Sequence, residues 1–189
     1  GGKVETTGEG AHGMFAYNSL ALNTGTIVTG GVSAYGMKAE DHSLIVNLST
    51  NSIETFGGGA HGMVADHFSL GLNTGSITTH GNLANGMVAK NWSLALNLGD
   101  ISTEGGQSYG MRVQDESFGL NTGSIITAGA DDIGMLVERF SSALNFGSIE
   151  TNGLGAHGME AFDHSLIANL GDGKIETTGE GAHGMLAHN

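Results

Sequence analysis

Four histidines recur in the phrase Ala-His-Gly-Met, and their residue type could support metal chemistry. They are His12, His61, His157 and His183. A zinc site needs several ligands that converge on one point, but equivalent positions elsewhere carry Tyr35, Asn85, Tyr109 and Ile133. Only the last two histidines fall in adjacent repeats. We therefore interpret the column as a stacked, half-buried ladder of rings, with a metal site as the alternative.

Acidic residues occupy the corner after the methionine phrase in five of the eight repeats, and stacked carboxylates favour Ca²⁺, which prefers oxygen ligands. Glu150 and Glu176 also occupy equivalent positions in neighbouring repeats, where their mutual repulsion hints at a cation. The Gly-Gly-x-Gly-x-Asp repeat of calcium-binding β-rolls is absent. We interpret the acids as a solvated face, with bound Ca²⁺ as the weaker alternative. The acids of this corner are Glu40, Asp41, Asp66, Asp115, Glu116, Glu138 and Asp163.

The sequence offers little support for catalysis, and we assign no catalytic, cofactor-binding or metal-binding residue. A polyuronate lyase would need clustered basic groups, and a glycoside hydrolase would need two carboxylates in different environments. The acids instead sit in repetitive columns, and no Gly-x-Ser-x-Gly phrase is present. The basic residues are dispersed over different repeats: Lys3, Lys38, Lys90, Arg112, Arg139 and Lys174.

The elements that must position these residues are set by an internal repeat of about 24 residues. Four columns stay in phase along the whole chain. The methionines are Met14, Met37, Met63, Met87, Met111, Met135, Met159 and Met185. The aliphatic column is Val4, Ile27, Ile53, Ile77, Ile101, Ile125, Ile149 and Ile175, with a threonine two residues after each. The asparagines are Asn23, Asn47, Asn73, Asn97, Asn121, Asn145 and Asn169.

Each repeat contains three short runs with a period of two residues, separated by glycine and polar corners, which is typical of one coil of a parallel β-solenoid. We predict an all-β fold of about eight coils, each with three strands, and right-handed by analogy with other long-coil β-helices. Residues 1–189 form one continuous solenoid in this interpretation. Glycine interrupts every run, which disfavours helices.

The alternation predicts which side chains face inward. In Ile-x-Thr and Met-x-Ala, we expect the named residues inside, which disfavours the outward threonine array of an ice-binding face. In Leu-x-Leu-Asn, we expect the leucines inside and the intervening residues outside. Those residues are Ala21, Ile45, Gly71, Ala95, Gly119, Ala143 and Ile167. The aromatic residues Phe56, Phe68, Trp92 and Phe140 are expected to lie outside, scattered singly, without forming a sugar-stacking platform.

Composition narrows the range of partners. The 189 residues include 34 glycines, no proline and no cysteine, and the net charge is −13. An acidic surface repels phosphates, which disfavours nucleic acid and anionic membranes as partners. The sequence contains no run of about 18 apolar residues, so it predicts no transmembrane helix. The absence of cysteine is compatible with secretion.

A larger period is superimposed on the coils. Residues 1–18 match residues 172–189 at an offset of 171, so seven coils form a unit and a second unit begins near Gly173. We expect the chain to belong to a longer array. Without capping segments, the terminal coils would expose strand edges, which favours end-to-end stacking.

The phrase Asn-Thr-Gly-Ser-Ile-x-Thr-x-Gly-x-x-Ala-x-Gly-Met, at 73–87 and 121–135, resembles the passenger repeats of bacterial autotransporter and haemagglutinin-like surface adhesins. The resemblance implies secretion and a rod on the bacterial cell surface, in contact with other cells. We expect a non-enzymatic structural or adhesive solenoid that self-associates by coil stacking, or that meets cell-surface glycans or proteins. The alternatives are a passive module that binds glycans or divalent cations along one face and, third, a polysaccharide-active enzyme.

Overall fold

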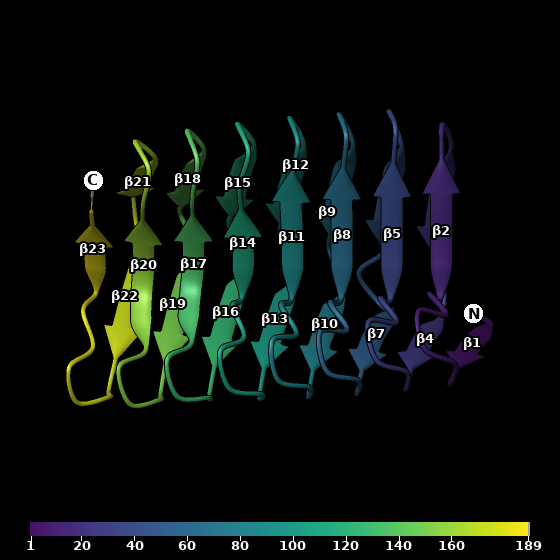
Figure 1. Cartoon of the computed structure of the whole chain (residues 1–189), viewed down its shortest axis with the longest axis horizontal. Helices are drawn as coiled ribbons and strands as arrows, with labels where there is room; N and C mark the ends of the chain where they lie inside the picture. Colours follow the sequence, from purple (N-terminus) through teal and green to yellow (C-terminus); the bar gives the residue numbers. More distant parts are fainter. Residues whose placement is uncertain (189) are drawn as a thin grey trace.

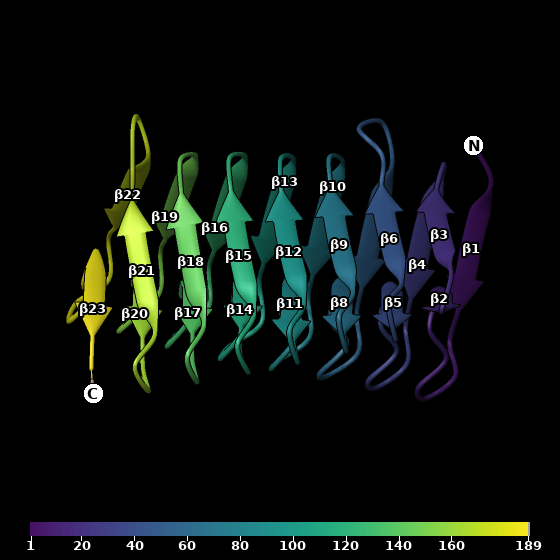
Figure 2. The ribbon, with the colours of Figure 1, turned by 90° about the horizontal axis from the view of Figure 1, so that it is seen from above.

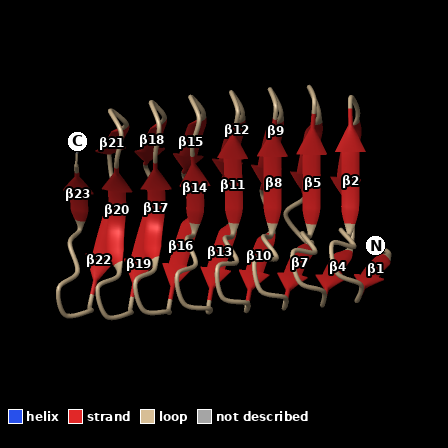
Figure 3. Ribbon diagram, in the orientation of Figure 1, coloured by secondary structure: helices blue, strands red, loops and turns tan. Residues whose placement is uncertain are grey.

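The chain winds into a straight stack of coils in which three strands per coil build three parallel sheets (Figures 1 and 3). The computed structural model describes residues 1–188, and these contain 23 strands and no helix. None of the described residues forms a helix that could cross a membrane. The fold is therefore the predicted all-β parallel solenoid.

The first sheet holds the Ile-x-Thr runs. Its strands, in spatial order, are β1 (Lys3–Thr6), β4 (Thr26–Thr29), β7 (Ser52–Thr55), β10 (Ser76–Thr79), β13 (Asp100–Thr103), β16 (Ser124–Thr127), β19 (Ser148–Thr151) and β22 (Lys174–Thr177).

The second sheet holds the Met-x-Ala runs. Its strands are β2 (Met14–Tyr17), β5 (Met37–Glu40), β8 (Met63–Asp66), β11 (Met87–Lys90), β14 (Met111–Val113), β17 (Ile133–Val137), β20 (His157–Ala161) and β23 (Met185–Ala187).

The third sheet holds the Leu-x-Leu-Asn runs. Its strands are β3 (Leu20–Asn23), β6 (Leu44–Asn47), β9 (Leu70–Asn73), β12 (Leu94–Asn97), β15 (Phe118–Asn121), β18 (Ser142–Asn145) and β21 (Leu166–Asn169).

The direction of winding can be followed in two views. The chain rises along the near side through β2, crosses the top toward the back through β3, and returns through β4 (Figures 1 and 2). It advances from right to left as it does so, which makes the solenoid right-handed. The expectation drawn from analogy is thus met.

Identical residues stack on each other through the middle of the solenoid. Ile77 pairs with Ile53 on one side and with Ile101 on the other, and Met87 pairs with Met63 in the same way. The isoleucines and methionines of the inner coils are fully buried. A single coil could not bury its inner face, so the fold depends on this stacking.

The buried threonines find backbone partners, as a buried hydroxyl requires. Thr79 Oγ1 donates to the carbonyl of Ala84 at 2.7 Å, and Thr29 makes the same bond to Ala34. In two coils this bond is missing, and the hydroxyls of Thr103 and Thr127 are buried without a partner among the described residues. In those coils, Ser108 and Asp132 replace the alanine.

The predicted orientation of the Leu-x-Leu-Asn strands is wrong. Ala95 is completely buried, whereas the neighbouring Leu94 is 41% exposed. The reason is the asparagine: Asn97 is buried in the core, and the residue two before it must share its face. Methionines from the second sheet fill the remaining space. Met87 Cε, for example, lies where it would be 3.5 Å from a Cβ added to Gly71. The leucines therefore face solvent.

The aromatic residues are not scattered singly, as the sequence suggested. The rings of Phe68 and Trp92 stack across adjacent coils at 6.4 Å, and His42 stacks on Phe68 at 5.4 Å. Phe140 stacks on His164. Sequence spacing hid these pairs because the partners are about 24 residues apart but one strand spacing apart in space.

Candidate functional site

The histidine column lies beside the second sheet, just before each Gly-Met phrase. The ring of His12 stacks on Tyr35 with 4.7 Å between centroids, and Tyr35 stacks on His61 at 5.0 Å. His157 and His183 stack at 5.2 Å. This matches the stacked ladder expected from the sequence.

Three of these rings, those of His12, His61 and His157, also hold the next coil through a hydrogen bond. His61 Nδ1 accepts a hydrogen bond from the backbone N–H of Asn85 at 2.9 Å, and His157 Nδ1 accepts from His183 at 3.0 Å. Because Nδ1 is an acceptor here, the proton of the neutral ring sits on Nε2. Among residues 1–188, no group of three or more His, Asp or Glu side chains is arranged to hold a metal ion.

His61 is held neutral by its surroundings. Burial, and then the positive charges of Arg112 and Lys90, lower the pKa of the His61 imidazole to about 4. The ring therefore serves as a hydrogen-bonding and stacking group at neutral pH.

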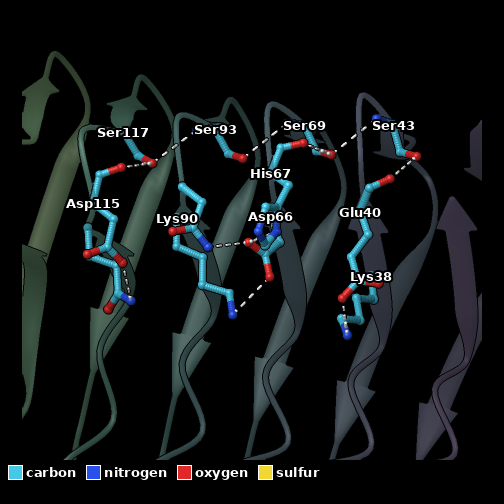
Figure 4. A network of polar contacts seen from close by, with 12 residues as sticks. Lys38, Glu40, Ser43, Asp66, His67, Ser69, Lys90, Ser93, Asp115 and Ser117 are labelled. Carbon is cyan, nitrogen blue, oxygen red and sulfur yellow. Dashed lines mark hydrogen bonds and ion pairs between the residues drawn. The ribbon is translucent and has the colours of Figure 1, made fainter. Parts of the chain in front are cut away.

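Asp66 anchors the acidic corner between the second and third sheets (Figure 4). Its buried carboxylate accepts bonds from Lys90 Nζ at 2.9 Å and Asn91 Nδ2 at 2.7 Å, and it faces His67 Nδ1 at 2.8 Å. Burial works to raise the pKa of Asp66, but the bonds from Asn91 and Lys90 outweigh it, so the pKa is lowered. Asp66 is thus an ionised acid with protein partners.

Other acids of the corner are paired as well. Lys38 Nζ lies 2.6 Å from Glu40, and Arg139 lies 3.1 Å from Asp115. Arg112 Nε donates to Glu138 at 2.9 Å. In these pairs a Lys or Arg side chain supplies positive charge to carboxylates that the sequence offered as ligands for Ca²⁺. The remaining predicted acids, Asp41, Glu116 and Asp163, lie in the same corner at positions with positive φ.

Glu150 and Glu176 pair directly across adjacent strands, as the sequence indicated. Each has a nearby partner of its own, however. Glu176 lies 2.6 Å from Lys174 Nζ, and Glu150 accepts from Asn152 Nδ2 at 3.0 Å. These contacts reduce the electrostatic reason for a cation between the two carboxylates.

The structure brings together a groove that the sequence did not reveal. It runs over β8, β11 and β14, between the ring ladder and the acidic corner. Its floor is apolar: Val64 and Val88 point outward yet are almost fully buried between the two walls. One wall consists of Tyr35, His61, Asn85 and Tyr109, and the other of Lys90 and Gln114. Arg112 follows Val64 and Val88 in the same column and closes one end of the floor.

The groove combines groups that could bind a polar ligand. Lys90 and Arg112, which seemed dispersed in the sequence, lie on adjacent coils and line the same hollow. Gln114 Nε2 donates to Asp115, but Gln114 Oε1 is buried without a hydrogen-bond partner among the described residues. A ligand hydroxyl could donate to this oxygen. The sequence signal was weak, consisting of two successive valines at outward positions.

Comparison with known proteins gives one family. The family model of the BigA third pectate lyase-like domain matches residues 1–123 and residues 29–161. The two matches overlap, as expected where one model fits a repeat in two registers, and together they span 1–161 of the 189 residues. No curated protein and no solved structure matches the chain. The words pectate lyase-like describe a fold and assign no reaction here. The chain belongs to the family of the BigA third pectate lyase-like domain.

Proposed function

We propose that this chain is a non-enzymatic segment of an extracellular rod on a bacterial cell surface, with a structural or adhesive role. The observation that carries the proposal is the uninterrupted stacking of all three sheets along the described chain. Each coil adds about 4.8 Å to the rod and presents the same faces to its surroundings. Such a stack suits an extended spacer that displays repeated surface groups.

The non-enzymatic proposal is supported by the distribution of the charged groups: Lys90 and Arg112, the two basic residues of the groove, are each paired with a carboxylate. Acid-base cleavage of a glycan needs two carboxylates that face one cleft in different environments. The described lining of the groove over β8, β11 and β14 contains no carboxylate. Asp66 and Asp115 instead form ion pairs at the adjacent corner.

Self-association by coil stacking is part of the proposal. The inner residues of the first and last coils are partly open, with Val4 and Met185 both exposed. The edges of β1 and β22 each have a free side in the described chain. A coil from neighbouring sequence or from another copy would cover these edges.

The test combines electron microscopy with an assay for polysaccharide cleavage. We expect slender rods and no release of reducing ends or unsaturated uronates from acidic and neutral polysaccharides above the buffer control. Sustained release that disappears in Arg112→Ala, with the fold intact by circular dichroism, would contradict the non-enzymatic assignment.

Passive glycan binding in the groove is a second candidate, supported by Tyr35, Arg112 and the unpartnered oxygen of Gln114. A glycan array probed with the purified chain tests it. We expect binding that Tyr35→Ala weakens at least tenfold. The matched control is Phe56→Ala, which removes an exposed ring at the corner just after β7. Equal loss in both variants, or no binding at all, would reject this candidate.

A further inference from the structure

The outer surface of the third sheet is almost entirely apolar. Two outward columns cross all seven strands, and we call them together the leucine face. The first column is Leu20, Leu44, Leu70, Leu94, Phe118, Ser142 and Leu166. The second is Leu22, Val46, Leu72, Leu96, Leu120, Leu144 and Ala168.

No charged residue occupies either column, although the chain carries a net charge of −13. Apolar side chains extend the leucine face on both sides. Exposed Phe68, Trp92 and Phe140 border the start of the strands, where the other coils carry Asn18, His42, Glu116 and His164. Exposed Leu98 and Phe146 follow the strand ends, alternating with Thr74 and Thr122. An apolar surface as long as the two columns is unusual on a protein that remains alone in solution.

The size of the leucine face matches a protein interface. Seven strands at about 4.8 Å and four residues at about 3.3 Å give a patch of roughly 34 by 13 Å. The apolar residues along its two borders widen it to at most about 20 Å, or at most about 700 Å² per copy. Two such faces in contact would bury at most about 1,400 Å², which lies within the range of stable interfaces.

The distribution of charge favours a second copy of the chain as the partner of the leucine face. The acids lie on the corners and on the other two sheets, so the repulsion between two copies is least when they join their uncharged faces. An anionic membrane would be repelled by the same corners. A second copy also offers a surface with the same strand spacing, and two flat sheets pack well at about 10 Å.

We propose that the leucine face pairs with the leucine face of a second copy, so that two solenoids lie side by side. This contact is distinct from coil stacking at the ends. Lateral pairing of one face on each copy closes at two copies, whereas end-to-end stacking continues into open filaments. The inference does not depend on the adhesive role.

The test is sedimentation equilibrium of the full chain over a range of concentrations. Below the concentrations at which the coil ends stack into filaments, we expect a monomer–dimer equilibrium that tightens as salt is added, because salt screens the repulsion between the acidic copies. The test variant is Leu70→Lys with Leu94→Lys, which places two charges in the leucine face. Its dimer dissociation constant should rise at least tenfold.

The control variant is Thr78→Lys with Ile126→Lys, at outward positions of the first sheet. Both double variants change the net charge from −13 to −11 by adding two lysines. The smaller net charge lowers the repulsion between copies in both variants. Weaker pairing of the Leu70→Lys, Leu94→Lys variant must therefore come from the two charges placed in the leucine face. The control should pair at least as well as the unaltered chain. Circular dichroism verifies that both variants remain folded.

Three results would overturn the proposal. The unaltered chain could stay monomeric at every concentration, or the leucine-face variant could dimerise as well as the control. The chain could also stay monomeric in solution and float with phosphatidylcholine vesicles through the leucine face, in which case lipid is the occupant.

Discussion

Asn97 Nδ2 donates to Asn121 Oδ1 across adjacent coils at 2.8 Å, and both side chains are completely buried. Asn97 Oδ1 in turn accepts from Asn73 Nδ2 at 2.8 Å. The amide of Asn97 therefore satisfies groups on both neighbouring coils. This relationship repeats along the solenoid and makes the asparagine column a continuous buried chain of hydrogen bonds.

Asn97→Ala should lower the free energy of unfolding by about 2–4 kcal/mol, because it leaves buried polar groups on two coils without their partner. Urea unfolding followed by circular dichroism measures the loss. The matched control is Asn169→Ala, at the exposed end of the same column, where water replaces the lost bond. Equal losses at the two positions would show that burial of the ladder is unimportant.

Gly86→Ala should destabilise the chain by at least about 2 kcal/mol, as overpacking of a close contact does. An added Cβ would lie 2.2 Å from Ile101 Cγ2 and 2.6 Å from the carbonyl of Gly110. Gly58→Ala is the control, because its Cβ would meet nothing nearer than 3.8 Å. Thermal unfolding should separate the two variants, and a harmless Gly86→Ala would contradict the close packing of adjacent coils.

His61 and Asp132 should oppose each other in the pH dependence of stability. Burial, Arg112 and Lys90 lower the pKa of His61 to about 4, so its contribution is lost as the pH falls from about 6.5 toward 4. Burial raises the pKa of Asp132 to about 6, so its contribution falls as the pH rises from about 4 to 6. Each amounts to about 3 kcal/mol over its window.

Substitution of one residue at a time should reveal the pH dependence that the other gives to the free energy of unfolding. His61→Asn, which copies the residue of the next coil, should leave stability falling as the pH rises from about 4 to 6. Asp132→Asn should leave stability rising over the same range. Urea unfolding at several pH values measures both. Parallel curves for the two variants would contradict the assigned pKa shifts.

His80 supplies a further pH-dependent contact. Its two ring nitrogens lie 3.0 Å from Glu54 and 2.7 Å from Glu104, on the coils before and after it. Burial opposes protonation, but the bonds to both carboxylates outweigh it and raise the pKa of His80. The stabilisation should be present below pH 6.5 and disappear as the pH rises through the raised pKa. Histidine titration by NMR should give a higher pKa for His80 than for His61. A lower pKa for His80 than for His61 would refute this.

The coil count, the three strands and the inward columns could be read from the sequence because each position recurs with the same residue type. Isoleucine and methionine specify the core whichever coil they occupy. The third sheet was misread because leucine and asparagine gave conflicting signals. The buried asparagine ladder decided the orientation, and hydrophobicity alone favoured the opposite one.

The groove and the aromatic columns escaped prediction for another reason. Lys90 and Arg112 are 22 residues apart in the sequence, and nothing in either coil marks them as neighbours on one surface. Their shared hollow lies beside the ring ladder, over Val64 and Val88. The shape of such a groove depends on the geometry of the corners, which the repeat pattern does not encode.

The solenoid is a rod built by adding equivalent coils, and the most direct test of this architecture is to lengthen the rod. Three further copies of residues 74–97 inserted after Asn97 should increase the maximum dimension by about 14 Å. Small-angle X-ray scattering, at a concentration where the chain is monomeric, should also show an unchanged cross-section. A wider particle, an unchanged length or loss of folding would contradict the stacked-coil account.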